Sequence, residues 1–112
     1  MADHDAEFRA CDAAVTLAFS VLGKRWNGMI VSSLGGGPST FVALRRAVVG
    51  ISDTVLSDRL AELGQARLVA RTVDPGPPVT VSYALTARGE GLLPILDQLG
   101  SWASANLESP EL

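Results

Sequence analysis

The chain has 112 residues, 47% of them hydrophobic, which is enough for one domain around one core and excludes a disordered chain. Its single cysteine, Cys11, and single histidine, His4, exclude a disulfide framework, a zinc cluster and a histidine-activated nucleophile, so we expect no metal, no cofactor and no enzyme. The net charge is -3, no apolar run reaches the roughly 18 residues of a membrane span, and the acidic start differs from a signal peptide, so we expect a cytoplasmic protein without membrane contact.

Two helices are predicted in the first third of the chain. Apolar residues recur at helical spacing from Phe8 to about Leu22, and Gly23 then interrupts the pattern. A second helix is expected from about Arg25. It ends at the glycines and the proline of residues 35–38, because glycine caps a helix and proline cannot continue one.

A helix-turn-helix is predicted over about residues 39–66. Ser39 or Thr40 can cap a short helix, and Gly50 marks a tight turn after it. Ser52 can cap a second helix that extends to the end of this range and carries leucines on one face. Two helices joined by such a turn are typical of a DNA-binding unit.

The hydrophobic period then changes from 3.6 to 2 over about residues 68–86, which predicts a hairpin. One strand is expected from Leu68 to Val73, followed by a loop rich in proline and glycine. The residues of the second strand that we expect to face inward are Val79, Val81, Tyr83 and Leu85. A hairpin directly after a helix-turn-helix indicates a wing. We assign to it the site residues Pro75, Gly76, Pro77, Pro78 and Thr80.

A last helix is predicted over about residues 87–107. Thr86 can cap this helix, and Pro94 should kink or divide it. Its apolar stripe packs either on its own domain or on a second copy of the chain. A reader of one half-site gains specificity from a second half-site, so we favour a homodimer. The predicted interface residues are Leu92, Ile95, Leu96, Leu99 and Trp102.

The second helix of the helix-turn-helix is the predicted DNA reader. Recognition helices present their N-terminal residues to base edges in the major groove, and Ser, Thr and Asp can bond to those edges. The predicted base-reading residues are Ser52, Asp53, Thr54, Ser57 and Asp58. An ordinary exposed polar face is the alternative. The two aspartates would be repelled by phosphates unless Arg59 or another base offsets them.

The net acidity of the chain belongs to its two ends. Residues 1–12 sum to -3 and residues 90–112 to -4, whereas residues 13–89 carry eight bases against four acids. A basic centre suits contact with DNA phosphates, although an ordinary solvated surface has similar charges. The predicted phosphate contacts are Lys24, Arg25, Arg45, Arg46 and Arg59.

The chain resembles the HxlR family of winged-helix regulators, which are relatives of the MarR type. The matching pieces run in order from Cys11 to Trp102 and cover about four-fifths of the chain. They include Leu22-Gly23-Lys24-Arg25-Trp26, Gly50-Ile51-Ser52, Val55-Leu56-Ser57-Asp58-Arg59-Leu60 and Tyr83-Ala84-Leu85-Thr86.

The resemblance implies homodimers held by the first and last helices, with two reading heads on a pseudo-palindromic operator. It also implies control of the protein's own gene or of a neighbouring gene. In several branches of the family a cysteine at the position of Cys11 senses electrophiles or oxidants. Judged from its residues alone, Cys11 is either a small buried hydrophobe or a reactive thiol.

Three positions depart from the family pattern. A basic residue is common where Thr54 stands, and arginine is common where Thr80 stands in the wing. The loop from Pro75 to Thr80 carries no base at all, which weakens the case for a wing contact with DNA. Glycine is usual where Arg67 stands at the end of the reading helix, and Gly64 nearby suggests that this helix ends earlier or differently.

The sequence thus predicts a mainly α, α+β winged helix-turn-helix in one domain over residues 1–112, with a hairpin wing and dimerisation helices at both ends. The predicted function is a sequence-specific regulator of transcription, a repressor that binds double-stranded DNA as a homodimer and responds to oxidants or electrophiles, or to an unidentified small molecule. The alternative is a dimeric winged-helix module for protein interaction or small-ligand binding, with little affinity for DNA.

Overall fold

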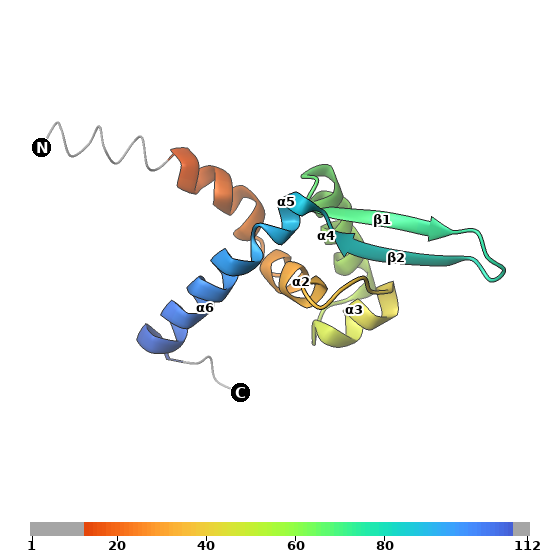
Figure 1. Ribbon diagram of the computed structural model, residues 1–112. Coiled ribbons are helices and arrows are strands. Elements are labelled where there is room, and N and C mark those ends of the chain that lie inside the picture. The colour runs from red at the N-terminus through yellow and green to blue at the C-terminus, as the bar shows by residue number, and fades with distance from the viewer. Residues whose placement is uncertain (1–12, 109–112) are drawn as a thin grey trace, which may run out of the picture.

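The computed structural model describes residues 13–108, which form a mainly helical domain with one two-stranded sheet (Figure 1). A helix over residues 13–22 precedes the labelled elements. These are α2 (Asn27–Leu34), α3 (Phe41–Ala47), α4 (Asp53–Gln65), β1 (Val69–Asp74), β2 (Thr80–Leu85), α5 (Ala87–Glu90) and α6 (Leu93–Asn106). The predicted order of helices, hairpin and final helix is confirmed.

Three helices begin at the hydroxyl caps that the sequence predicts. The side-chain oxygen of Thr40 accepts from the Ala43 N–H at 3.1 Å, so Thr40 rather than Ser39 caps α3. The Ser52 oxygen accepts from the Val55 N–H at 3.2 Å at the start of α4. Thr86 caps α5 in the same way. Each cap satisfies a backbone donor that has no partner within its helix and contributes about 1 kcal/mol.

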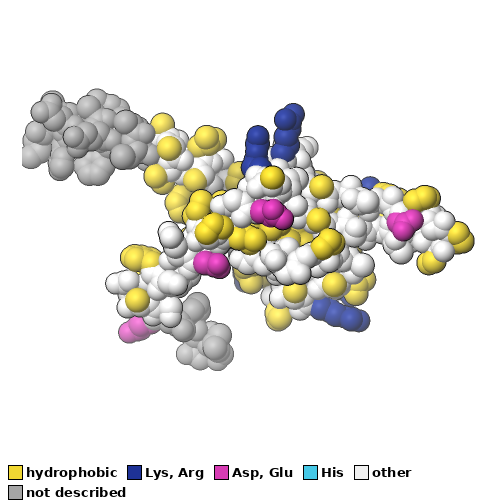
Figure 2. All heavy atoms as spheres, viewed as in Figure 1, with side chains coloured by type: hydrophobic (Ala, Val, Ile, Leu, Met, Phe, Trp, Pro, Cys, Tyr) yellow, Lys and Arg dark blue, Asp and Glu magenta, His cyan; other side chains and the backbone are white. Residues whose placement is uncertain are grey.

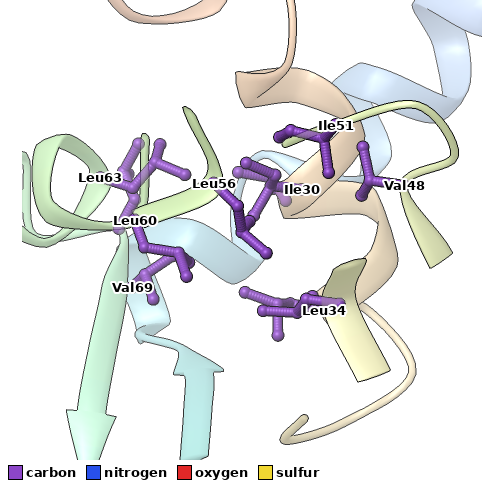
Figure 3. Packing of buried hydrophobic residues seen from close by; sticks show 11 residues of the cluster. Ile30, Leu34, Val48, Ile51, Leu56, Leu60, Leu63 and Val69 are labelled. Atoms are coloured by element: carbon purple, nitrogen blue, oxygen red, sulfur yellow. The ribbon is translucent and has the colours of Figure 1, made fainter. Parts of the chain in front are cut away.

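The core lies between α2, α3 and α4 and closes against the base of the hairpin (Figure 3). Aliphatic side chains supply it, as the small number of aromatic residues predicts. Its buried hydrophobic residues are Ile30, Val31, Leu34, Leu44, Val48, Ile51, Leu56, Leu60, Leu63, Leu68 and Val69. The leucines predicted on one face of the reading helix are therefore the ones that hold α4 in place.

The turns on either side of α4 use left-handed backbone conformations. Gly50, between α3 and α4, has φ 94°, which glycine adopts without strain. Arg67, just after α4, has φ 62°, which is disfavoured for a residue with a Cβ atom. The Leu68 N–H donates to the Leu63 carbonyl and the Arg67 N–H to the Gly64 carbonyl, both at 3.0 Å, so the helix ends in a Schellman motif. α4 thus ends at Gln65, which confirms the predicted end at about residue 66, and the suggestion that Gly64 ends the helix earlier is wrong.

The hairpin projects from the body (Figure 1); β1 is exposed beyond Val69, whereas β2 is half-buried beyond Thr80. β1 and β2 pair antiparallel from Val69↔Leu85 to Asp74↔Thr80. Val79 lies outside β2 and is 66% exposed, so the prediction that it faces inward is wrong. Ser39 adds a bridge to the hairpin: its N–H donates to the Tyr83 carbonyl at 2.9 Å, and the Tyr83 N–H donates back at 2.8 Å. This bridge was not predicted.

The predicted last helix is divided into α5 and α6. The break falls at Gly91 and Leu92, and Pro94 lies in the first turn of α6, where a missing N–H costs nothing. Figure 1 shows α6 and the helix over residues 13–22 leaving the body on the side away from the hairpin tip. Within residues 13–108 no helix combines the length and the apolar character that crossing a membrane requires.

Candidate nucleic-acid interface

The N-terminal half of α4 presents the predicted base-reading side chains to solvent. Asp53, Thr54, Ser57 and Asp58 are exposed, while leucines bury the opposite face of the same helix. Ser52 is exposed too, but its oxygen is occupied as the helix cap. Ser52 therefore keeps its hydroxyl proton and a second lone pair for DNA, and Thr54, Ser57 and Asp58 are exposed without an ion pair or a capping role within residues 13–108.

An ion pair links the two helices of the helix-turn-helix. Arg45 of α3 donates from Nη1 to the two carboxylate oxygens of Asp53, at 2.9 Å and 3.2 Å. The charge of Asp53 is thus offset by Arg45, not by Arg59. Asp58 forms no ion pair with any residue of the described range. Both members of the Arg45–Asp53 pair are exposed, so DNA phosphates can compete with the carboxylate for this guanidinium.

A second polar cluster surrounds Glu62 on α4. Its carboxylate accepts from Lys24 Nζ at 2.7 Å and from Asn27 Nδ2 at 3.1 Å, and Arg59 Nη1 lies 3.7 Å away. Asn27 is buried, and its Nδ2 also donates to the Val21 carbonyl at 2.7 Å. The hydrogen bonds from Lys24 and then Asn27 hold the pKa of Glu62 below its ordinary value.

The five predicted phosphate contacts therefore have different surroundings. Lys24 and Arg59 converge on Glu62, and Arg45 pairs with Asp53. Arg25 is exposed and lies with its guanidinium 4.4 Å from the centre of the Trp26 ring. Arg46 is also exposed and has no ion pair within residues 13–108. Of the set, Arg46 is the cation most available to an external anion.

The wing is exposed along its whole tip, including Pro75, Gly76, Pro77, Pro78 and Thr80. The Asp74 carboxylate accepts from the Gly76 N–H at 3.1 Å and shapes the loop. The only basic residue on the two strands is Arg71 of β1, which is exposed. It was not among the predicted contacts, because its orientation depends on how the hairpin sits against α4.

The predicted dimer residues on α6 fall into two groups. Leu92 and Leu96 pack partly against the domain's own core. Ile95, Leu99 and Trp102 are 55%, 48% and 55% exposed, and α6 buries no residue completely. The first group therefore anchors α6, and the second forms an apolar face that no residue between 13 and 108 covers.

The helix over residues 13–22 carries a second exposed apolar face. Leu17 is 72% exposed and Phe19 55%. A groove of about 410 Å³ separates this helix from α5 and α6 and is lined mainly by aliphatic side chains. In Figure 2 hydrophobic side chains gather over both projecting helices. Cys11, the predicted sensor, lies outside the described residues.

A helix-turn-helix with an exposed polar reading helix and an adjacent hairpin defines a winged-helix DNA-binding protein. Residues 21–111 match the family model described as HxlR-like helix-turn-helix. The chain belongs to this family, and the relatives that it resembles are transcriptional regulators. The predicted family and fold class are confirmed.

Individual relatives agree with this assignment. The chain is 43% identical over 86 residues to the HTH-type transcriptional regulator YodB of Bacillus subtilis, a match that covers 77% of each chain. Quinone-bound YodB from B. subtilis aligns with a TM-score of 0.72 and 37% identity over 82% of this chain and 96% of YodB. The redox regulator HypR in its oxidised form aligns with a TM-score of 0.78 and 30% identity over 86% of this chain and 99% of HypR.

Proposed function

We propose that this regulator represses transcription as a homodimer whose two α4 helices read the half-sites of a pseudo-palindromic operator. The observation that carries the proposal is the pair of apolar faces on the helix over residues 13–22 and on α6, which no part of residues 13–108 covers. A second copy would bury them and place two reading helices on one operator.

The dimer is tested by sedimentation. Trp102→Glu places a charge on the exposed apolar face of α6, and we expect the dimer to dissociate at least roughly tenfold more readily because burial of an unpaired charge is costly. Ser104→Glu is the matched control, since residue 104 stands on the opposite side of the same helix. Equal dissociation constants for the two variants would place the interface elsewhere.

DNA binding is tested on the sequence upstream of the protein's own gene. Specific binding whose log affinity falls steeply with log salt is expected, because phosphate contacts release counterions. Arg46→Ala should weaken binding to all sequences, whereas Thr54→Ala should change base preference. Absence of any preference over random DNA at low salt would contradict the proposal.

We further propose that Cys11 makes the regulator responsive to quinones or oxidants. The support is the similarity to quinone-bound YodB and oxidised HypR. A Cys11 thiolate can add to a quinone ring, forming a carbon–sulfur bond and, after proton transfer, a hydroquinone. Quinone treatment should lower the DNA affinity of the wild type and leave Cys11→Ser unchanged; an equal response of both would exclude this role.

A second candidate is a dimeric interaction module with little DNA affinity. The observations that favour it are the absence of a base between Pro75 and Thr80 and the lack of an ion-pair partner for Asp58 among residues 13–108. The salt series distinguishes the two candidates, since such a module binds DNA weakly and without sequence preference.

A further inference from the structure

We propose that the groove between α4 and the hairpin is a binding site for a DNA backbone phosphate, with Arg71 as its cation and Ser57 and Tyr83 as hydroxyl donors. The groove has a volume of about 320 Å³. Its lining residues are Ser57, Leu60, Ala61, Gly64, Val69, Arg71 and Tyr83. The inference rests on the proposed DNA-binding function and adds a contact to it.

The strand register places Arg71 over this groove. Residues 69, 71 and 73 share one face of β1, because alternate side chains of a strand point the same way. Val69 is buried and lies beside Leu60 of α4 in Figure 3, so this face of the hairpin is the one turned toward the recognition helix. Arg71 follows two residues farther out, where the groove opens, and stands directly opposite Tyr83 on β2.

The chemistry of the groove suits an anion. Arg71 is exposed and has no ion pair within the described part of the chain. No Asp or Glu is among the groove's lining residues, and the remaining polar groups are the hydroxyls of Ser57 and Tyr83. A guanidinium with neighbouring hydroxyl donors matches the oxygens of a phosphate.

The geometry of DNA brings a phosphate to this place. In a double helix one sugar–phosphate backbone separates the major groove from the adjacent minor groove. If α4 lies in the major groove, a backbone passes between α4 and a hairpin that flanks it. Ser57 and Ala61 belong both to the exposed side of α4 and to the groove, so the reading face continues into the phosphate site.

This site also explains how a wing without bases can contribute to binding. The loop from Pro75 to Thr80 has no cation to place in a minor groove. Arg71 stands closer to the body, where the strand is held by its pairing with β2 and by the bridge between Ser39 and Tyr83. The hairpin then contributes through a rigid strand rather than through its tip.

The test compares Arg71→Ala with Arg88→Ala, which removes the same charge from α5, beside the other groove. At fixed salt Arg71→Ala should bind operator and random DNA at least about tenfold more weakly, and the slope of log affinity against log salt should fall by about 2, because the dimer loses one phosphate contact at each of two half-sites. Arg88→Ala should keep the wild-type slope. Arg71→Lys, which retains the charge, should keep the slope and lose only part of the affinity.

A single neutral methylphosphonate, moved along the operator backbone, identifies the phosphate. One position per half-site should weaken the wild type and have no further effect on Arg71→Ala. If the wild type binds DNA but Arg71→Ala retains its affinity and slope, with its fold verified by circular dichroism, the phosphate site is overturned while the regulator stands. If the wild type itself does not bind DNA, the proposed function fails as well.

Discussion

Arg67 holds a left-handed conformation at the end of the recognition helix, and Arg67→Gly should therefore stabilise the fold. The conformation, with φ 62°, is fixed by the Schellman hydrogen bonds and by the Thr86 hydroxyl, which donates to the Arg67 carbonyl at 2.7 Å. A left-handed L-residue costs roughly 1–2 kcal/mol. Glycine relieves this strain, but it also gives the unfolded chain more conformational freedom, which destabilises the fold by about 0.4–1 kcal/mol. The net gain in the free energy of unfolding is therefore about 0.5–1 kcal/mol.

The assay is urea denaturation at equal protomer concentration, since a dimer's apparent stability depends on concentration. Arg67→Ala is the control, because alanine removes the charged side chain but retains the Cβ atom that causes the strain. The glycine variant should be more stable than both the wild type and the alanine variant, with an unchanged m-value. Equal midpoints for the glycine and alanine variants would refute the reasoning from backbone strain.

Three further predictions concern the body of the domain. Glu62→Gln should cost about 1 kcal/mol of unfolding free energy, because it weakens the hydrogen bonds from Lys24 and Asn27. Since folding lowers the pKa of Glu62 from 4.5, the stability that its carboxylate contributes is present above that pH and is lost as pH falls through the lowered value. Urea denaturation between about pH 3 and about pH 7 should therefore show a weaker dependence of stability on pH in Glu62→Gln than in the wild type. Leu63→Ala, at a fully buried position, should cost about 3 kcal/mol in the same assay, and a cost under about 1 kcal/mol would contradict the packing described. Gly89→Ala should also destabilise, because an added Cβ would collide with the Leu68 carbonyl; an unchanged melting temperature would argue against that close approach.

The sequence predicts the local features of this fold well. Ser52 and Thr86 cap helices because hydroxyl oxygens accept from free N–H groups three residues ahead, and this chemistry is visible in the order of residues alone. The alternation of apolar and polar residues that identifies β2 is likewise visible in the order of residues alone. Its extension to Val79 fails because the hairpin projects beyond the body, where neither face has anything to pack against.

The pairing of charges was less predictable. We expected Arg59 or another base to offset the negative charge of Asp53. The base that does so is Arg45 on the preceding helix, while Arg59 lies near Glu62. These partners are set by how α3 and α4 cross, which depends on the packed core. The orientation of Arg71 toward α4 has the same origin, so the groove between them could not be derived from spacing.

The hydrogen bonds of Asn27 have a mechanical consequence. This buried amide donates both to the last turn of the helix over residues 13–22, at the Val21 carbonyl, and to Glu62 on α4. The Asn27 side chain thus connects the helix proposed to face the second copy to the helix proposed to enter DNA. In the proposed dimer a small change in the angle at which the two copies cross would therefore change the distance between their α4 helices. Since major-groove faces on one side of DNA recur about every 34 Å, a dimer whose α4 helices have this spacing binds both half-sites, and a dimer with another spacing dissociates.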